Sequence, residues 1–124
     1  VLTEAVTSVS PIPANDVAMT SSWIREDVLA VGYGVTRYNG SDSGVKRSVE
    51  IPITHVFDDR FGWVNNNYNT CYGDSGGPAL MEVNGVLSVV GVTSYGDRRC
   101  ARFGVDTRVD NFMNWLDPYI QTYN

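Results

Sequence analysis

The stretch Thr70–Pro78 (TCYGDSGGP) places one serine among glycines and directly after a carboxylate. A serine hydroxyl is a weak nucleophile at neutral pH, so chemistry at Ser75 requires a general base and donors for an oxyanion. Gly73 can turn its backbone N–H toward the same point as that of Ser75, and Gly76 and Gly77 let another backbone come close. The length of this run predicts a nucleophile with an oxyanion site rather than an incidental glycine turn.

The sequence contains one imidazole that is a candidate for the base. His55 is the only histidine, and Asp58 and Asp59 follow it closely enough to suggest a local Asp-His-Ser group. A solitary histidine in a strand-like run is more often a surface residue or a hydrogen-bonded core residue. We therefore expect His55 to take no part in the chemistry of Ser75.

The composition limits the classes of partner. The chain has 124 residues, a size that suits one domain burying roughly two-thirds of its unfolded surface. Its net charge is −5 and its nine Lys and Arg are scattered, so we expect no nucleic-acid partner and no anionic membrane surface. No apolar run approaches the roughly 20 residues that span a bilayer. One histidine and scattered carboxylates predict no metal site and no cofactor.

The two cysteines, Cys71 and Cys100, form an even count. This count is compatible with one disulfide in an oxidising compartment or with two cytosolic thiols. The first residue, Val1, is not Met, which suggests cleavage or trimming before it.

Runs rich in β-branched and aromatic residues, bounded by Gly, Asn, Asp or Ser, predict strands. They cover Val28–Thr36, Val45–Val56, Ala79–Val83, Val86–Ser94 and Phe103–Val109. Asn84-Gly85 between two of them is the strongest short hairpin signal, because both residues accept positive φ. With five or six short strands, we predict an all-β fold, a single antiparallel six-stranded β-barrel with a C-terminal α-helix.

The two ends of the chain differ from the middle. Residues 1–22 contain Pro11 and Pro13 and little periodicity, which predicts an extended strap. Residues 110–122 carry one apolar stripe, and Asp110 is a suitable N-cap for a terminal helix. We expect Pro118 to kink that helix or to end its regular part. No repeat or linker divides residues 1–124, so one domain is expected.

Four segments together resemble the trypsin/chymotrypsin family of serine endopeptidases. Thr70–Leu80 resembles the family's nucleophile segment, and Ser94-Tyr95-Gly96 resembles the strand that lines the primary pocket and pairs with substrate. Phe103–Val109, with Asn111, Trp115 and Leu116, resembles the last strand and helix. Val31–Val35 resembles the Gly-Trp-Gly strand that starts the second barrel. The resemblance spans all 124 residues and implies the second of that family's two barrels.

Carried over by position, the resemblance assigns roles to individual residues. It implies that Ser75 is the nucleophile, that Gly73 and Ser75 supply the oxyanion hole, and that Cys71 and Cys100 form a disulfide beside the pocket. The implied substrate-binding residues are Asn69, Thr70, Ser94, Tyr95, Gly96, Gly104 and Asp106.

The same resemblance makes two predictions about the primary pocket. Asn69 at the floor is neutral, which argues against plain selectivity for Arg or Lys, while Gly96 and Gly104 imply room for an aromatic or other long side chain. Asp106 stands where the family usually has an aromatic residue. It either restores a negative charge near the floor or has no influence on the substrate, and the sequence leaves these two alternatives open.

The family's histidine and aspartate belong to its first barrel, upstream of everything seen here. We therefore expect a divided active site, in which an N-terminal barrel chain joins this one non-covalently because both cysteines are already paired. In the family the carboxylate before the serine pairs with an α-ammonium group released by cleavage, which implies the same role for Asp74. Thr3 and Glu4 depart from the family's new terminus, so Val1 is more readily understood as a cleavage scar.

The resemblance predicts a secreted endopeptidase, extracellular or periplasmic, that cleaves a peptide or protein substrate through an acyl-enzyme. The alternative is a protease-like binding or regulatory protein that performs no catalysis. Arg98, Arg99 and Arg102 flank Cys100 and are expected at the pocket rim, as a solvated loop in preference to a reader of acidic residues.

Overall fold

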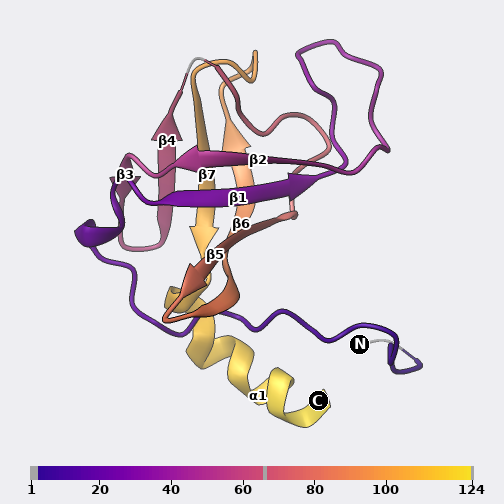
Figure 1. Cartoon of the computed structure of the whole chain (residues 1–124), viewed down its shortest axis with the longest axis vertical. Helices are drawn as coiled ribbons and strands as arrows, with labels where there is room; N and C mark the ends of the chain where they lie inside the picture. Colours follow the sequence, from indigo (N-terminus) through magenta and orange to yellow (C-terminus); the bar gives the residue numbers. More distant parts are fainter. Residues whose placement is uncertain (1–2, 66, 124) are drawn as a thin grey trace.

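One antiparallel sheet of seven strands, followed by one helix, forms the body of the molecule (Figure 1). The structure is a computed structural model, and it describes the chain except residues 1–2, 66 and 124. The strands are β1 (Asp27–Gly32), β2 (Arg47–Pro52), β3 (His55–Val56), β4 (Arg60–Val64), β5 (Pro78–Val83), β6 (Val86–Gly96) and β7 (Phe103–Arg108). Their order in the sheet is β2-β1-β5-β6-β7-β4-β3. The predicted all-β antiparallel class with a C-terminal helix is confirmed.

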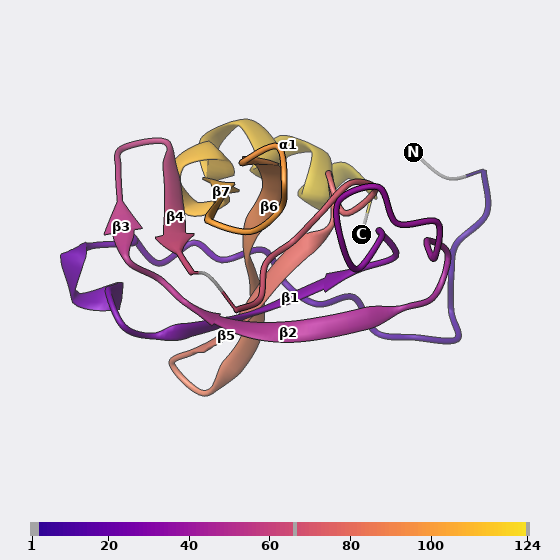
Figure 2. The same ribbon diagram turned by 90° about the horizontal axis from the view of Figure 1, so that it is seen from above.

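The predicted number of six strands is wrong, because the stretch Val45–Val56 is two strands and because β4 was not predicted. Ile53 exchanges backbone hydrogen bonds of 2.9 Å with Arg25 and Glu26, and this interruption separates β2 from β3. Strand β2 pairs with β1, whereas β3 pairs with β4. The two edge strands of the sheet are thus neighbours in sequence, and the sheet curls into a half-barrel (Figure 2).

The hairpin predicted at Asn84-Gly85 is present. Strands β5 and β6 pair antiparallel up to Val83 and Val86, and the two turn residues have φ of 51° and 80°. Positive φ at both positions is what a two-residue hairpin turn requires.

The interior of the half-barrel is filled by side chains from most of its strands. The fully buried large side chains are Val28, Ile51, Ile53, Phe61, Trp63, Val90 and Asp106. In β4 the aromatic residues Phe61 and Trp63 alternate with Gly62, and both rings point inward. This strand was not among those predicted, although two aromatic residues at a spacing of two are a strand signal.

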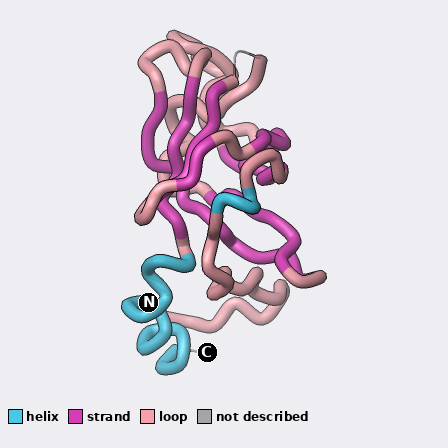
Figure 3. The backbone as a smooth tube through the Cα atoms, turned by 90° about the vertical axis from the view of Figure 1, so that its left-hand side faces the viewer, coloured by secondary structure: helices cyan, strands magenta, loops and turns pink. Residues whose placement is uncertain are grey.

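The N-terminal segment crosses one end of the sheet as an extended strap, with one isolated parallel bridge between Ala14 and Val89 (Figures 1 and 3). Farther along, the N–H of Met19 donates to the Asp110 carboxylate over 2.8 Å. The strap ends in a short 3₁₀ helix, η1 (Ser21–Trp23).

The C-terminal segment forms a 3₁₀ turn, η2 (Asp110–Phe112), and then α1 (Met113–Tyr123), which lies at the strap end of the sheet (Figure 3). Asp110 does not occupy the N-cap; its carboxylate is bound instead by Arg108 and the N–H of Met19. Helix α1 continues past Pro118, so of the two predicted effects of this proline, a kink or an end to the helix, the second is wrong. Among the described residues, no helix has the length and apolar character needed to cross a membrane.

Candidate active site

Ser75 lies within the second of two consecutive tight turns. The N–H of Asp74 donates to the carbonyl of Cys71 over 3.1 Å, and the N–H of Gly77 donates to the carbonyl of Asp74 over 2.9 Å. Gly73 and Gly76 have φ of 95° and 82°, a region that favours glycine. The glycines flanking this serine therefore permit a backbone path that leaves Ser75 exposed to solvent.

The nucleophile turn is anchored to strand β6. The N–H of Gly76 donates to the carbonyl of Thr93, and the N–H of Thr93 donates to the carbonyl of Gly77, both over 2.9 Å. A Cβ on Gly77 would lie 2.8 Å from the carbonyl oxygens of Val31 and Asp74. Glycine at this position thus allows the turn to press against β1 and β6 at the same time.

The N–H groups of Gly73 and Ser75 are available to a ligand. No acceptor among the described residues takes a hydrogen bond from either group, whereas the neighbouring N–H groups of Asp74, Gly76 and Gly77 are all bonded. Two unbonded backbone donors beside a serine hydroxyl are the arrangement that an oxyanion hole requires.

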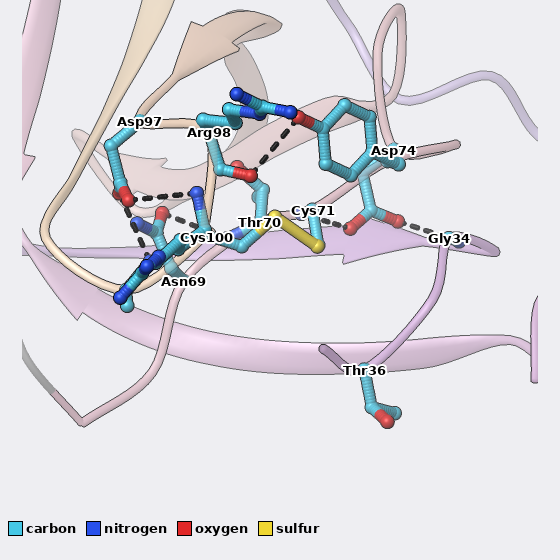
Figure 4. The surroundings of a disulfide bond; sticks show 12 residues. Gly34, Thr36, Asn69, Thr70, Cys71, Asp74, Asp97, Arg98 and Cys100 are labelled. Carbon is cyan, nitrogen blue, oxygen red and sulfur yellow. Dashed lines mark hydrogen bonds between the residues drawn. A yellow bond between two sulfur atoms is a disulfide. The ribbon is translucent and has the colours of Figure 1, made fainter. Parts of the chain in front are cut away.

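The Asp74 carboxylate binds the backbone of two neighbouring segments. Its two oxygens accept from the N–H of Gly34 over 2.7 Å and from the N–H of Cys71 over 2.8 Å (Figure 4). A side chain on Gly32 or Gly34 would overlap this carboxylate. The Gly-Tyr-Gly stretch therefore forms the cradle in which Asp74 sits.

Asp74 also lines a cavity of about 240 Å³ between β1, β2 and the segment 67–70. Its lining includes the apolar residues Val31, Val35 and Val49. Val1, the α-ammonium partner considered for Asp74, lies outside the described residues.

A disulfide joins Cys71 to Cys100, with their Cα atoms 5.2 Å apart, as the family resemblance implied. Figure 4 shows it between Asp97 and Arg98 on one side and Asp74 and Gly34 on the other. The described residues contain no free cysteine. The bond connects the nucleophile segment to the segment that follows β6.

A cavity of about 230 Å³ opens beside Ser75 and the disulfide. Its lining residues are Thr70, Cys71, Tyr72, Ser75, Ser94, Tyr95, Gly96, Asp97 and Cys100. The structure therefore brings Thr70, Ser94, Tyr95 and Gly96 together beside the serine hydroxyl. Asn69, Gly104 and Asp106 do not line this cavity.

The side chain of Asn69 is held by Trp63 from the half-barrel core. Its Oδ1 accepts from the indole N–H of Trp63 over 2.8 Å and from the N–H of Thr70 over 2.9 Å. A Cβ on Gly104 would lie 2.7 Å from this oxygen and would overlap the Trp63 ring. The space above Gly104 is therefore filled by Trp63 and Asn69.

Asp106 is a fully buried carboxyl group in the half-barrel interior, between Phe61 on β4 and Thr93 on β6. Desolvation raises the pKa of Asp106 to about 7, against a lowering effect of the Thr93 side chain. Neither carboxylate oxygen has a hydrogen-bond partner of normal geometry among the described residues. We therefore regard burial as the decisive influence on this group.

His55 lies on the short edge strand β3, away from the nucleophile turn, which precedes β5 on the other side of the sheet (Figure 1). Its Nδ1 shares a hydrogen bond of 2.8 Å with the Thr54 hydroxyl, and its ring stacks on Phe57. No contact with Ser75 is present, as expected from the sequence. A general base for Ser75 is not found among the described residues.

Sequence reasoning missed two groups at the cavity, Tyr72 and Asp97. The Tyr72 hydroxyl donates to the carbonyl of Arg98 over 3.0 Å. The Asp97 carboxylate accepts from four backbone N–H groups of the segment that follows it. An aspartate directly after Gly96 and before a turn was the available signal, since aspartate side chains commonly bind the backbone of the next few residues. Among the described residues no group of three or more His, Cys, Asp or Glu could hold a metal ion.

Comparison with known proteins gives one family, described as Trypsin, which matches residues 3–116. The proclotting enzyme of Tachypleus tridentatus is 31% identical over 86% of this chain and 32% of its own length. Serine protease snk of Drosophila melanogaster is 31% identical over 73% of this chain and 26% of its own length. The hepatocyte growth factor activator serine protease of Mus musculus is 41% identical over 48% of this chain and 10% of its own length. The chain thus spans about a third or less of each of these relatives.

Proposed function

Because this chain belongs to the trypsin family of serine proteases, we propose that it is the nucleophile-bearing half of a secreted serine endopeptidase. The observation that carries the proposal is the exposed Ser75 hydroxyl next to two backbone N–H groups without acceptors, at the mouth of a cavity of about 230 Å³. A binding protein would have no physical need of this combination.

The proposed reaction follows from these groups. Ser75 Oγ attacks the carbonyl carbon of the substrate residue whose side chain fills the cavity, and its proton passes to an imidazole. The N–H groups of Gly73 and Ser75 stabilise the negative charge that develops on the carbonyl oxygen. The amine product leaves with that proton, and water then releases the acyl group from Ser75.

The imidazole and its aspartate come from a first barrel outside residues 1–124. An exposed apolar surface supports this proposal: Val92, Phe112 and Trp115 are 38%, 40% and 62% exposed, and with Leu116 they line a cavity of about 350 Å³. Ser94 lines both this cavity and the one beside Ser75. A body seated on this surface would therefore reach the nucleophile. Because Cys71 and Cys100 are paired with each other, we propose that residues 1–124 meet the first barrel through non-covalent contacts.

Asp74 serves the nucleophile turn indirectly in this proposal. A cationic α-ammonium group that enters the cavity of about 240 Å³ would meet the Asp74 carboxylate. The carboxylate already accepts hydrogen bonds from the N–H groups of Gly34 and Cys71, which fix the nucleophile turn. An α-ammonium group would add a charge partner to this carboxylate.

We propose an uncharged, aromatic or other long substrate side chain for the primary pocket. Asn69 carries no charge, and the Asp97 carboxylate that lines the cavity is occupied by backbone N–H groups. Asp106 stays buried away from the cavity. A peptide-library cleavage profile tests this preference against one for Arg or Lys.

Secretion is proposed because of the disulfide, since such bonds persist in oxidising compartments.

The second candidate function is a non-catalytic binding protein. Its support is the cavity beside Ser75, which a ligand could occupy without any reaction.

A fluorophosphonate probe separates the two functions. The full protein, with its first barrel present, is expected to label at Ser75, and Ser75→Ala is expected to abolish labelling. Ser43→Ala, which removes an exposed serine elsewhere, should label normally. Absence of labelling with both halves present would favour the binding protein. Native mass spectrometry of active material should find a second polypeptide segment that contains His and Asp.

A further inference from the structure

The segment that follows β6 carries three arginines close in sequence to two residues that line the primary cavity. Asp97 and Cys100 line that cavity, and Arg98 and Arg99 lie between them in sequence, with Arg102 two residues beyond Cys100. The three arginines are exposed. They account for a third of the nine cationic residues in a chain whose net charge is −5.

Asp97 holds this segment in one conformation. One carboxylate oxygen accepts from the N–H groups of Arg102 at 2.7 Å, Ala101 at 2.9 Å and Phe103 at 3.2 Å, and the other accepts from Arg99 at 3.1 Å. The disulfide at Cys100 also connects this segment to Cys71 in the nucleophile segment. A short loop with this many internal bonds presents its side chains from a preorganised backbone.

The Asp97 carboxylate directs its negative charge at the backbone N–H groups of its own segment. Although desolvation acts to raise it, the pKa of Asp97 is lowered by the N–H groups of Arg102, Phe103, Ala101 and Arg99. No guanidinium of the three arginines forms an ion pair or a side-chain hydrogen bond with the described residues. The same holds for the isolated Arg25 and Arg37, whereas Arg47, Arg60 and Arg108 have acidic partners. The edge of the cavity is thus a site of unpaired positive charge on an acidic protein.

From this arrangement we infer that Arg98, Arg99 and Arg102, which we call the arginine rim, bind acidic side chains of the substrate. The inference rests on the proposed function, because it places a substrate in the cleft. In the family resemblance, substrate backbone pairs with the strand matched by Ser94–Gly96, and this strand leads directly into Asp97 and Arg98. We propose that the residues before the cleaved bond follow this path. The acidic side chains therefore belong to the segment before the cleaved bond.

The expected size of the effect follows from exposed ion pairs. Each such pair is worth a factor of about 1.4 to 5 in affinity, so three together predict a preference of about tenfold. The preference should weaken as salt increases, because the screening length falls from about 10 Å at 0.1 M to about 3 Å at 1 M.

The test uses the full protein with Ser75→Ala, so that bound peptides are not hydrolysed. Two peptides share one aromatic residue for the cavity and differ only by three Glu or three Gln before it. Fluorescence anisotropy at low salt should show about tenfold tighter binding of the Glu peptide. Because binding and not turnover is measured, this result does not depend on whether the unmodified protein labels with fluorophosphonate.

Substitution then identifies the residues responsible. The triple variant R98Q/R99Q/R102Q should bind both peptides with the affinity of the Gln peptide, and it should keep the fold, because these side chains form no internal hydrogen bonds among the described residues. Arg25→Gln, the same change at an exposed arginine near Ile53, should leave the tenfold preference intact.

Three results would overturn the inference. The first is an equal affinity for the Glu and Gln peptides in the Ser75→Ala protein. The second is a preference that survives in the triple variant. The third is an equal preference when the Glu residues follow the aromatic residue, or when glycine replaces that residue, since the arginines would then act as a general polyanion site.

Discussion

The indole N–H of Trp63 donates to Oδ1 of Asn69 over 2.8 Å, which links the half-barrel core to the side chain that resemblance places at the pocket floor. Gly104 lies against both groups and has no room for a side chain. The position of Asn69 is thus set by a buried aromatic residue and not by the cavity that opens beside Ser75.

Replacement of Trp63 by Phe should therefore lower the free energy of unfolding. The variant keeps an aromatic ring in the core but loses the donor to Asn69, a change expected to cost about 1–3 kcal/mol. Urea unfolding of the full protein measures it. Tyr33→Phe is the matched control: it also removes a donor from an aromatic ring, but Tyr33 is 55% exposed, so its replacement should change stability by less than about 0.5 kcal/mol. Equal losses in the two variants would contradict the role given to the Trp63–Asn69 bond.

Gly73→Ala should impair the oxyanion site through steric contact as well as backbone strain. Gly73 has φ of 95°, and a Cβ there would lie 3.0 Å from the Cα of Gly34. Gly44 has almost the same φ, 93°, but nothing lies within 4 Å of its Cβ position. Each alanine should cost about 1–2 kcal/mol of backbone strain.

Only Gly73→Ala should also reduce fluorophosphonate labelling at Ser75, by about tenfold or more, because its N–H can no longer hold the same direction. Thermal unfolding and labelling rates of the two variants provide the comparison. If Gly44→Ala slowed labelling to the same extent, general backbone strain would be the cause.

Asp106 should make the stability of the protein depend on pH between about 4 and 7. Its pKa rises from 3.8 to about 7 in the folded state, so the folded protein retains a proton that the unfolded chain releases. The stabilisation is fully present below pH 3.8 and is lost as the pH rises through 7. At 1.36 kcal/mol per pKa unit, the total loss is about 4 kcal/mol.

Asp106→Asn should remove most of this slope, making the variant more stable than the parent at pH 8 but not at pH 4. Urea unfolding across this pH range measures the difference. Asp27→Asn, at an exposed strand position, should leave the slope in place. A parent protein with constant stability from pH 4 to 8 would mean that Asp106 is solvated or paired in solution.

The disulfide should contribute to stability through the length of the loop that it closes. Cys71 and Cys100 are 29 residues apart, for which chain entropy predicts about 3.5 kcal/mol. The double variant C71S/C100S should unfold at correspondingly lower urea, and reductant should have no further effect on it. Full stability of the double variant would show that Asp97 and the strand pairs alone hold the two segments together.

The parts of the site that could be predicted from sequence depend on local geometry. The glycines around Ser75 and the Asn84-Gly85 hairpin occupy positive-φ positions that few other residues accept. The signals for these features lie within a few residues of the features themselves, so a single sequence was sufficient to locate them.

The parts that could not be predicted depend on contacts between distant segments. The bond between Trp63 and Asn69 depends on how β4 and the following loop pack against Gly104, and the split of 45–56 depends on backbone pairing between Ile53 and residues 25–26. Neither partner of Ile53 carries a sequence signal that marks it. Strand β4 was missed because Asp58, Asp59 and Arg60 precede its short aromatic alternation.

The pairing of β5 with both β6 and β1 also implies an order of assembly. The β5–β6 hairpin needs a two-residue turn, whereas the β1–β5 pairing joins Leu29 to Leu80, about 50 residues apart in sequence. Local hairpins close quickly, while pairings over long loops pay a larger entropic cost before any contact forms. We expect the β5–β6 hairpin to form first and the β1–β5 pairing last. Because the nucleophile turn packs against both β1 and β6, it acquires its final shape only when refolding is nearly finished.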